Sequence, residues 1–126
     1  MQEAELFEYL KRYWIDLKMS TDQYSKHDCF SQEYNTRIEL KCRKKHYNRL
    51  MLERNKYRHL MIKHILYNEV PLYINYTPKG IYCFDLRKIN PVWIIDERMP
   101  KTTEFENTNK VTKEYCMLSI YNSHKI

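Results

Sequence analysis

The sequence predicts one domain that mixes helices with strands, of the α/β or α+β class. Helix-like and strand-like segments follow one another in the order helix, strands, helix, strands. A strict alternation of polar and apolar residues over 36–43 marks one strand clearly. The length of 126 residues suits a single compact domain. Apolar residues (43%) and aromatic residues (14%) supply a core, which excludes a disordered chain.

The first third of the chain predicts one helix and two short strands. Residues 2–14 place their large apolar side chains at helical spacing, namely Leu6, Phe7, Leu10 and Trp14. We expect strands around 15–19 and 25–30, with a loop between them. Residues 31–35, Ser-Gln-Glu-Tyr-Asn, are typical of a turn and lead into the strand over 36–43.

The middle of the chain predicts a long helix followed by a hairpin. Residues 46–68 carry an apolar stripe at helical spacing, made of Tyr47, Leu50, Met51, Tyr57, Met61 and Ile65. The other face of this helix is basic, with Arg49, Arg54, Lys56, Arg58 and Lys63. Pro71 ends the helix. Residues 71–77 and 81–86 predict two strands joined by the turn Pro78-Lys79-Gly80.

The pattern weakens beyond Pro91. Short strands are expected at 92–95 and 114–120. The polar stretch 100–113 is either a substrate loop or a variable surface loop.

Charge and composition narrow the class of partner. The chain has 22 Lys and Arg against 16 Asp and Glu, a net charge of +6, which favours nucleic acid or simply solubility. No segment approaches the roughly 18 apolar residues of a membrane span, and no apolar signal core begins the chain, so a cytoplasmic location is expected. The four cysteines form no C-x-x-C pair. Reduced thiols are therefore favoured over a zinc site built from His27 and Cys29 or from Cys42 and His46.

The alternating strand brings chemically useful side chains onto one face. Ile38, Leu40 and Cys42 lie on one side and can enter a core, while Arg37, Glu39, Lys41 and Arg43 lie on the other.

A hairpin turn centred between Glu33 and Tyr34 places Asp28 directly opposite Glu39, with Cβ atoms about 4.5–5.5 Å apart. Two opposed carboxylates repel each other unless a positive charge lies between them. Mg²⁺, which takes one or two carboxylates together with waters, supplies that charge.

This layout suits phosphodiester hydrolysis. A divalent cation lowers the pKa of a bound water and neutralises charge on a phosphate. Lys41, two residues beyond Glu39, can stabilise the attacking hydroxide and the transition state. The alternative is an ion-pair ladder on an exposed sheet face, which a pairing of Asp28 with Glu39 disfavours.

The spacing of Asp28 from Glu39-Leu40-Lys41 resembles the PD-(D/E)XK nuclease superfamily, over roughly residues 2–86. Three further strings are similar to small nuclease-like proteins of bacteriophages: Tyr24-Ser25-Lys26-His27-Asp28, Thr77-Pro78-Lys79-Gly80 and Met99-Pro100-Lys101-Thr102-Thr103. One departure is that His27, and not proline, precedes Asp28.

The resemblance implies a restriction-endonuclease-like α/β core, a mixed central sheet flanked by helices, with additional C-terminal strands. It implies one nuclease-like domain over 1–126, with a core at about 2–86 and a C-terminal extension at about 87–126. The implied activity is that of a Mg²⁺-dependent DNA endonuclease, with Mn²⁺ as a substitute and without a small-molecule cofactor. Asp28, Glu39 and the Leu40 carbonyl would hold the metal, and Lys41 would be the catalytic lysine.

The resemblance further implies a DNA partner and action in the host cytoplasm if a phage encodes the protein. A resolvase would need a homodimer to cut opposing strands, whereas a nickase or damage-specific enzyme need not dimerise. Glu3 is the best candidate for an additional acid from the first helix, although glutamates there also favour the helix dipole. Candidate DNA contacts, which a solvated basic face would equally explain, are Arg43, Lys44, Lys45, Arg49 and Lys56.

Two other functions compete with the nuclease. One is a catalytically silent nuclease fold that binds nucleic acid or inhibits a host protein. The other is a structural or assembly protein with an incidental motif match.

Overall fold

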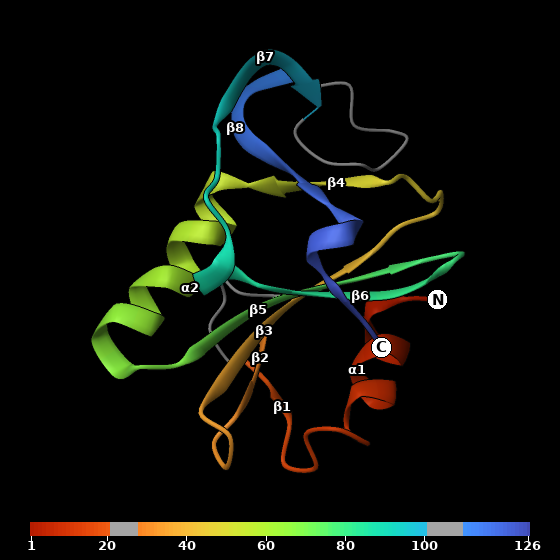
Figure 1. Ribbon diagram of the computed structural model, residues 1–126, viewed down its shortest axis with the longest axis vertical. Helices are drawn as coiled ribbons and strands as arrows, with labels where there is room; N and C mark the ends of the chain where they lie inside the picture. Colours follow the sequence, from red (N-terminus) through yellow and green to blue (C-terminus); the bar gives the residue numbers. More distant parts are fainter. Residues whose placement is uncertain (21–27, 101–109) are drawn as a thin grey trace.

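The computed structural model describes residues 1–20, 28–100 and 110–126. A six-stranded sheet with the order β1-β2-β3-β5-β6-β9 lies at its centre (Figure 1). Its strands are β1 (Lys18–Met19), β2 (Asp28–Ser31), β3 (Thr36–Cys42), β5 (Val70–Thr77), β6 (Gly80–Asp85) and β9 (His124–Lys125). The sheet is mixed, because β3 and β5 are parallel while the other neighbouring pairs in it are antiparallel.

Helices cover both faces of this sheet. Helix α1 (Glu3–Leu10) packs on one face, and helix α2 (Arg54–Tyr67) packs on the other (Figure 1). A second, three-stranded antiparallel sheet lies on the α2 side, formed by β4 (Arg49–Glu53), β8 (Lys110–Ser119) and β7 (Ile94–Pro100). The short 3₁₀ helices η1 (Leu86–Lys88) and η2 (Ile120–Asn122) follow β6 and β8.

Two hydrophobic cores follow from the period-two pattern of the central strands. On the α1 side, Ile38 and Leu40 of β3 pack with Leu6 and Leu10. On the α2 side, Leu60 packs with Tyr73 of β5 and with residues of β4, β6 and β8, namely Leu50, Leu52, Phe84, Cys116 and Leu118. The odd-numbered residues of β3 therefore face α2, as the alternation over 36–43 predicts.

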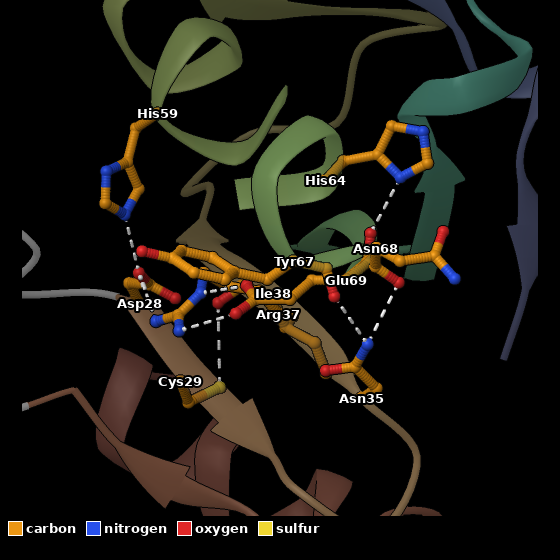
Figure 2. A network of polar contacts seen from close by, with 10 residues as sticks. All are labelled: Asp28, Cys29, Asn35, Arg37, Ile38, His59, His64, Tyr67, Asn68 and Glu69. Carbon is orange, nitrogen blue, oxygen red and sulfur yellow. Dashed lines mark hydrogen bonds and ion pairs between the residues drawn. The ribbon is translucent and has the colours of Figure 1, made fainter. Parts of the chain in front are cut away.

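The end of α2 is tied to the turn between β2 and β3. Asn68, in the left-handed conformation at φ 56°, caps the helix. The side-chain amide of Asn35 donates to the carbonyl oxygens of Tyr67 (3.1 Å) and Asn68 (3.0 Å), as Figure 2 shows. These bonds hold the C-terminal end of α2 beside the β2–β3 hairpin.

The predicted helix over 46–68 is wrong in its first part. Residues Arg49–Glu53 form β4, and the helix begins only at Arg54. Leu50 and Leu52 alternate with more exposed neighbours and pair with β8, so their period is that of a strand. The predicted stripe fails at both ends, because the side chains of Tyr47 and Ile65 are exposed.

The other predicted elements are found with shifted bounds. The first helix ends at Leu10, and the strands expected at 15–19 and 25–30 are β1 and β2. The strand expected at 92–95 is β7, which begins and ends later. The strand expected at 114–120 is β8, which begins earlier and is longer. The polar stretch 100–113 mostly lies outside the described residues. No described helix is long and apolar enough to cross a membrane.

Candidate active site

The predicted pairing of Asp28 with Glu39 is confirmed. The two residues are directly opposite each other on β2 and β3. Lys56 and His59, one turn apart on α2, contact them, so both carboxylates lie on the sheet face that α2 covers. Asp28 is fully buried and Glu39 is 4% exposed. Two acids are thus held together out of water, an arrangement that requires compensating positive charge.

Asp28 receives its compensation from two elements. Its Oδ2 atom accepts from Arg37 Nη1 of β3 at 3.3 Å and lies 2.9 Å from His59 Nε2 of α2. Its Oδ1 atom is buried and has no hydrogen-bond partner among the described residues. Burial raises the pKa of Asp28 above its usual value, against the lowering effects of His59 and Arg37.

Glu39 is compensated by a lysine that we expected to bind DNA. Lys56 Nζ lies 3.3 Å from Glu39 Oε1. Burial nevertheless raises the pKa of Glu39, and the charge of Asp28 adds to that increase. Lys56 is therefore placed as a partner of the carboxylate pair and not as a free basic residue on an outer helix face.

Arg37 joins the pair to a third buried acid. Its guanidinium contacts Glu69 through Nε–Oε1 (2.6 Å) and Nη2–Oε2 (3.3 Å), so it bridges Asp28 and Glu69, as Figure 2 shows. The same side chain stacks on Phe30, 4.7 Å from the ring centroid. His64 of α2 contacts the backbone carbonyl of Glu69 at 2.9 Å. This network fixes the buried acids against α2 and β5.

Lys41 lies next along the same face of β3. It lines a small cavity of about 60 Å³ together with Glu39, Leu40, Arg43, Met51, Glu53, Lys56 and Tyr73. Because the Leu40 side chain packs in the opposite core, its backbone is what faces this cavity. Burial, and then the nearby charge of Arg43, lower the pKa of Lys41 below its usual value. A partly desolvated ammonium thus adjoins Glu39.

Arg43 does not present its charge outward, as a DNA contact would require. Its Nη2 donates to the Met51 carbonyl at 2.6 Å and to the Tyr73 hydroxyl at 3.1 Å. Its Nε donates to Asn75 Oδ1 at 3.0 Å, while the buried Asn75 Nδ2 finds no partner among the described residues. Arg43 therefore forms one wall of the cavity, and its hydrogen bonds link the end of β3 to β4 and β5.

The other candidate DNA contacts are exposed, but not on a helix. Lys44 and Lys45 lie in the β3–β4 connection, and Arg49 begins β4. Glu3 begins α1, on the other side of the sheet from Asp28 and Glu39. Burial raises the pKa of Cys42 and the charge of Glu3 adds to that increase, while burial lowers the pKa of Lys41 and the charge of Glu3 partly opposes that lowering. Glu3 is therefore not placed beside the carboxylate pair.

The donor set fits a hard divalent cation. No cluster of three or more His, Cys, Asp or Glu side chains that could hold a metal occurs in residues 1–20, 28–100 and 110–126. Mg²⁺, however, is commonly bound through only one or two carboxylates and several waters. Two opposed carboxylates, with the Asp28 Oδ1 atom buried and unpartnered among these residues, meet that requirement.

Sequence reasoning missed the role of His59. Lys56 and His59 are three residues apart on one helix, and such residues share a face. That spacing was a usable signal, since both side chains meet the β2–β3 carboxylates. The Arg37–Glu69 pair, 32 residues apart, had no such local signal.

Comparison with known proteins identifies the fold. No protein-family model and no curated protein matches the sequence. Among solved structures, the chain is similar to Hjc, a Holliday junction resolvase from the archaeal hyperthermophile Archaeoglobus fulgidus, with a TM-score of 0.57 and 16% identity. The match covers 99% of this chain and 93% of that one. The expected restriction-endonuclease-like α/β fold, with its mixed sheet between two helices, is thereby confirmed.

Proposed function

We propose that this protein is a metal-dependent DNA endonuclease of the junction-resolvase type. The observation that carries the proposal is the buried pair of opposed carboxylates, Asp28 and Glu39, with Lys41 next on the same face of β3. The fold is also that of a solved structure named as a Holliday junction resolvase. A merely structural sheet face has no need to bury two acids against each other.

Asp28, Glu39 and the Leu40 carbonyl would hold Mg²⁺ or Mn²⁺. When bound, the cation lowers the pKa of a water and neutralises charge on the scissile phosphate. The Lys41 ammonium, partly shielded from solvent, donates to the phosphate oxygens where negative charge develops. Arg37 and His59 hold the Asp28 carboxylate in position, and Lys56 does the same for Glu39.

DNA binding would use the exposed Lys44, Lys45 and Arg49, which adjoin the cavity through the β3–β4 connection. We further propose that the protein acts on branched DNA as a homodimer, because cutting two opposing strands requires two sites. A phage origin and action in the host cytoplasm complete the proposal, which rests for this part on the phage-like strings of the sequence.

The test is a cleavage panel of linear, supercoiled, flapped and four-way-junction DNA, with RNA added, in Mg²⁺. We expect cleavage of at least one DNA form by the wild type, none by Asp28→Asn or Glu39→Gln, and cleavage reduced by about 100-fold or more in Lys41→Ala. Glu33→Gln, an exposed acid in the β2–β3 turn, is the matched control and should cleave normally. Wild-type protein that binds junctions but cleaves nothing in Mg²⁺ or Mn²⁺ would contradict the proposal.

A second candidate is a nuclease fold that binds DNA without cutting it. The observation that favours it is that Arg37, His59 and Lys56 already contact both carboxylates. It predicts salt-sensitive DNA binding that Glu39→Gln leaves unchanged, with no cleavage under any divalent ion.

A further inference from the structure

A groove lies beside the small cavity that holds Lys41. It has a volume of about 560 Å³ and is lined by Arg43, Tyr47, Asn48, Arg49, Leu50, Met51 and Met117. Ligand pockets typically have such volumes and an apolar lining with a few polar groups. Here Met51 and Met117, which are partly exposed, supply the apolar surface.

The rim of the groove carries an exposed aromatic ring among cations. Tyr47 is 59% exposed, in a position where the helical pattern predicts a core residue. Arg49 is exposed on the same rim, and Lys44 and Lys45 precede it in the chain. The lining residues, all within the described chain, include no acid. The ring of Tyr47 can stack on a nucleobase, the methionine side chains can pack against the same base, and the neighbouring cations can bind its phosphate.

The groove continues the candidate active site. Arg43 and Met51 line both the groove and the cavity that contains Glu39 and Lys41. Arg43 forms the partition, since its guanidinium is bound to the Met51 carbonyl and to Asn75. A nucleotide in the groove would therefore be a near neighbour of a phosphate placed at Lys41.

We propose that this groove binds an unpaired base of the substrate, stacked on Tyr47, next to the phosphate that is cut. The proposal rests on the nuclease function and adds the substrate class, which is DNA with an unpaired nucleotide at or beside a branch. Paired bases inside a continuous duplex present only their edges, so a stacking groove selects for unpaired ones.

The test uses 2-aminopurine, a fluorescent adenine analogue, placed once in a flap or bulge and once fully paired in the same duplex. Binding is measured in EDTA, where no cleavage interferes. We expect the wild type to quench the unpaired probe and to bind that DNA more tightly than the paired duplex. Tyr47→Ala should weaken binding of the unpaired form by about 5- to 100-fold and abolish the quenching, while Tyr47→Phe retains both.

The matched control is Tyr34→Ala, which removes an exposed tyrosine at the other end of β3. It should behave as the wild type. Equal binding of paired and unpaired DNA by the wild type, or unchanged quenching in Tyr47→Ala, would overturn the groove assignment. Base capture without cleavage in Mg²⁺ would overturn the nuclease function alone. Cleavage without Tyr47-dependent capture would overturn the groove alone.

Discussion

Asp28 and Glu39 lie directly opposite each other on antiparallel strands, and both carboxylates are buried. The charges of Arg37 and Lys56 and the contact of His59 with Asp28 offset part of the cost of this burial, yet burial still raises the pKa values of both acids. The pair is therefore held in an unfavourable electrostatic state that a divalent cation would relieve.

Magnesium should stabilise the folded protein. Binding to the native state alone contributes about 2.7 kcal/mol at a concentration 100 times the dissociation constant. Thermal unfolding with and without MgCl₂ measures the effect. Asp28→Asn should lose the magnesium-dependent increase in melting temperature, and Glu33→Gln should keep it. An equal increase in all three proteins would mean that the cation binds elsewhere.

Glu39 should make stability fall as pH rises. Its folded-state pKa is raised above the ordinary value for a glutamate, so the folded state binds the proton more tightly than the unfolded state. Ionised Glu39 therefore lowers the free energy of unfolding. This penalty is absent at pH values below the unfolded-state pKa and is fully present above the raised folded-state pKa. In metal-free urea unfolding, the stability of Glu39→Gln relative to the wild type should therefore be greater at about pH 8 than at about pH 4.5. A difference independent of pH would contradict the raised pKa.

Lys41 should set the alkaline limit of cleavage. Its pKa is lowered by burial, so its ammonium loses the proton at lower pH than an exposed lysine does. The cleavage rate should fall as the pH rises through the pKa of Lys41. Lys41→Ala should reduce the rate by about 100-fold or more without loss of junction binding. If the Lys41→Arg variant is active, its cleavage rate should no longer fall at alkaline pH, because arginine stays charged.

Arg37 should be essential for stability. Arg37→Ala leaves Asp28 and Glu69 buried without their shared cation, and removal of one partner of a buried ion pair costs about 3–5 kcal/mol. Arg87→Ala is the matched control, because the Arg87 side chain is exposed, its partner Asp85 is only partly buried, and such a pair contributes about 1 kcal/mol or less. Urea unfolding compares the two. Similar reductions of stability in both variants would show that the Arg37 ion pairs contribute little to the free energy of unfolding.

The exposed cations of the β3–β4 connection should bind phosphate. Lys44→Ala, Lys45→Ala and Arg49→Ala should each weaken DNA binding and make the slope of log K against log[salt] shallower by about 0.9, because each variant neutralises one phosphate fewer. Lys18→Ala, which removes an exposed lysine from β1, should leave the slope unchanged. Fluorescence anisotropy over a range of NaCl concentrations measures it. An unaltered slope in all four variants would place the DNA elsewhere.

The alternation over 36–43 and the turn residues after Ser31 were enough to predict the β2–β3 hairpin, its register and the common face of Glu39 and Lys41. These features depend on a few neighbouring residues, because a strand has a period of two and a short turn determines which residues pair. The order of helices and strands could be predicted for the same reason, but the residues at which they begin and end could not.

Tertiary contacts decided the rest. Residues 49–53 became β4, and not the start of a helix, because they pair with the distant strand β8 and bury Leu50 and Leu52 there. The partners of the two carboxylates are Lys56 and His59 of α2 and Arg37 of β3, which is in turn held by Glu69, the residue before β5. Long-range pairing and burial override local helical propensity, so only the folded chain assigns Lys56 and His59 to the acids and leaves Tyr47 at the surface.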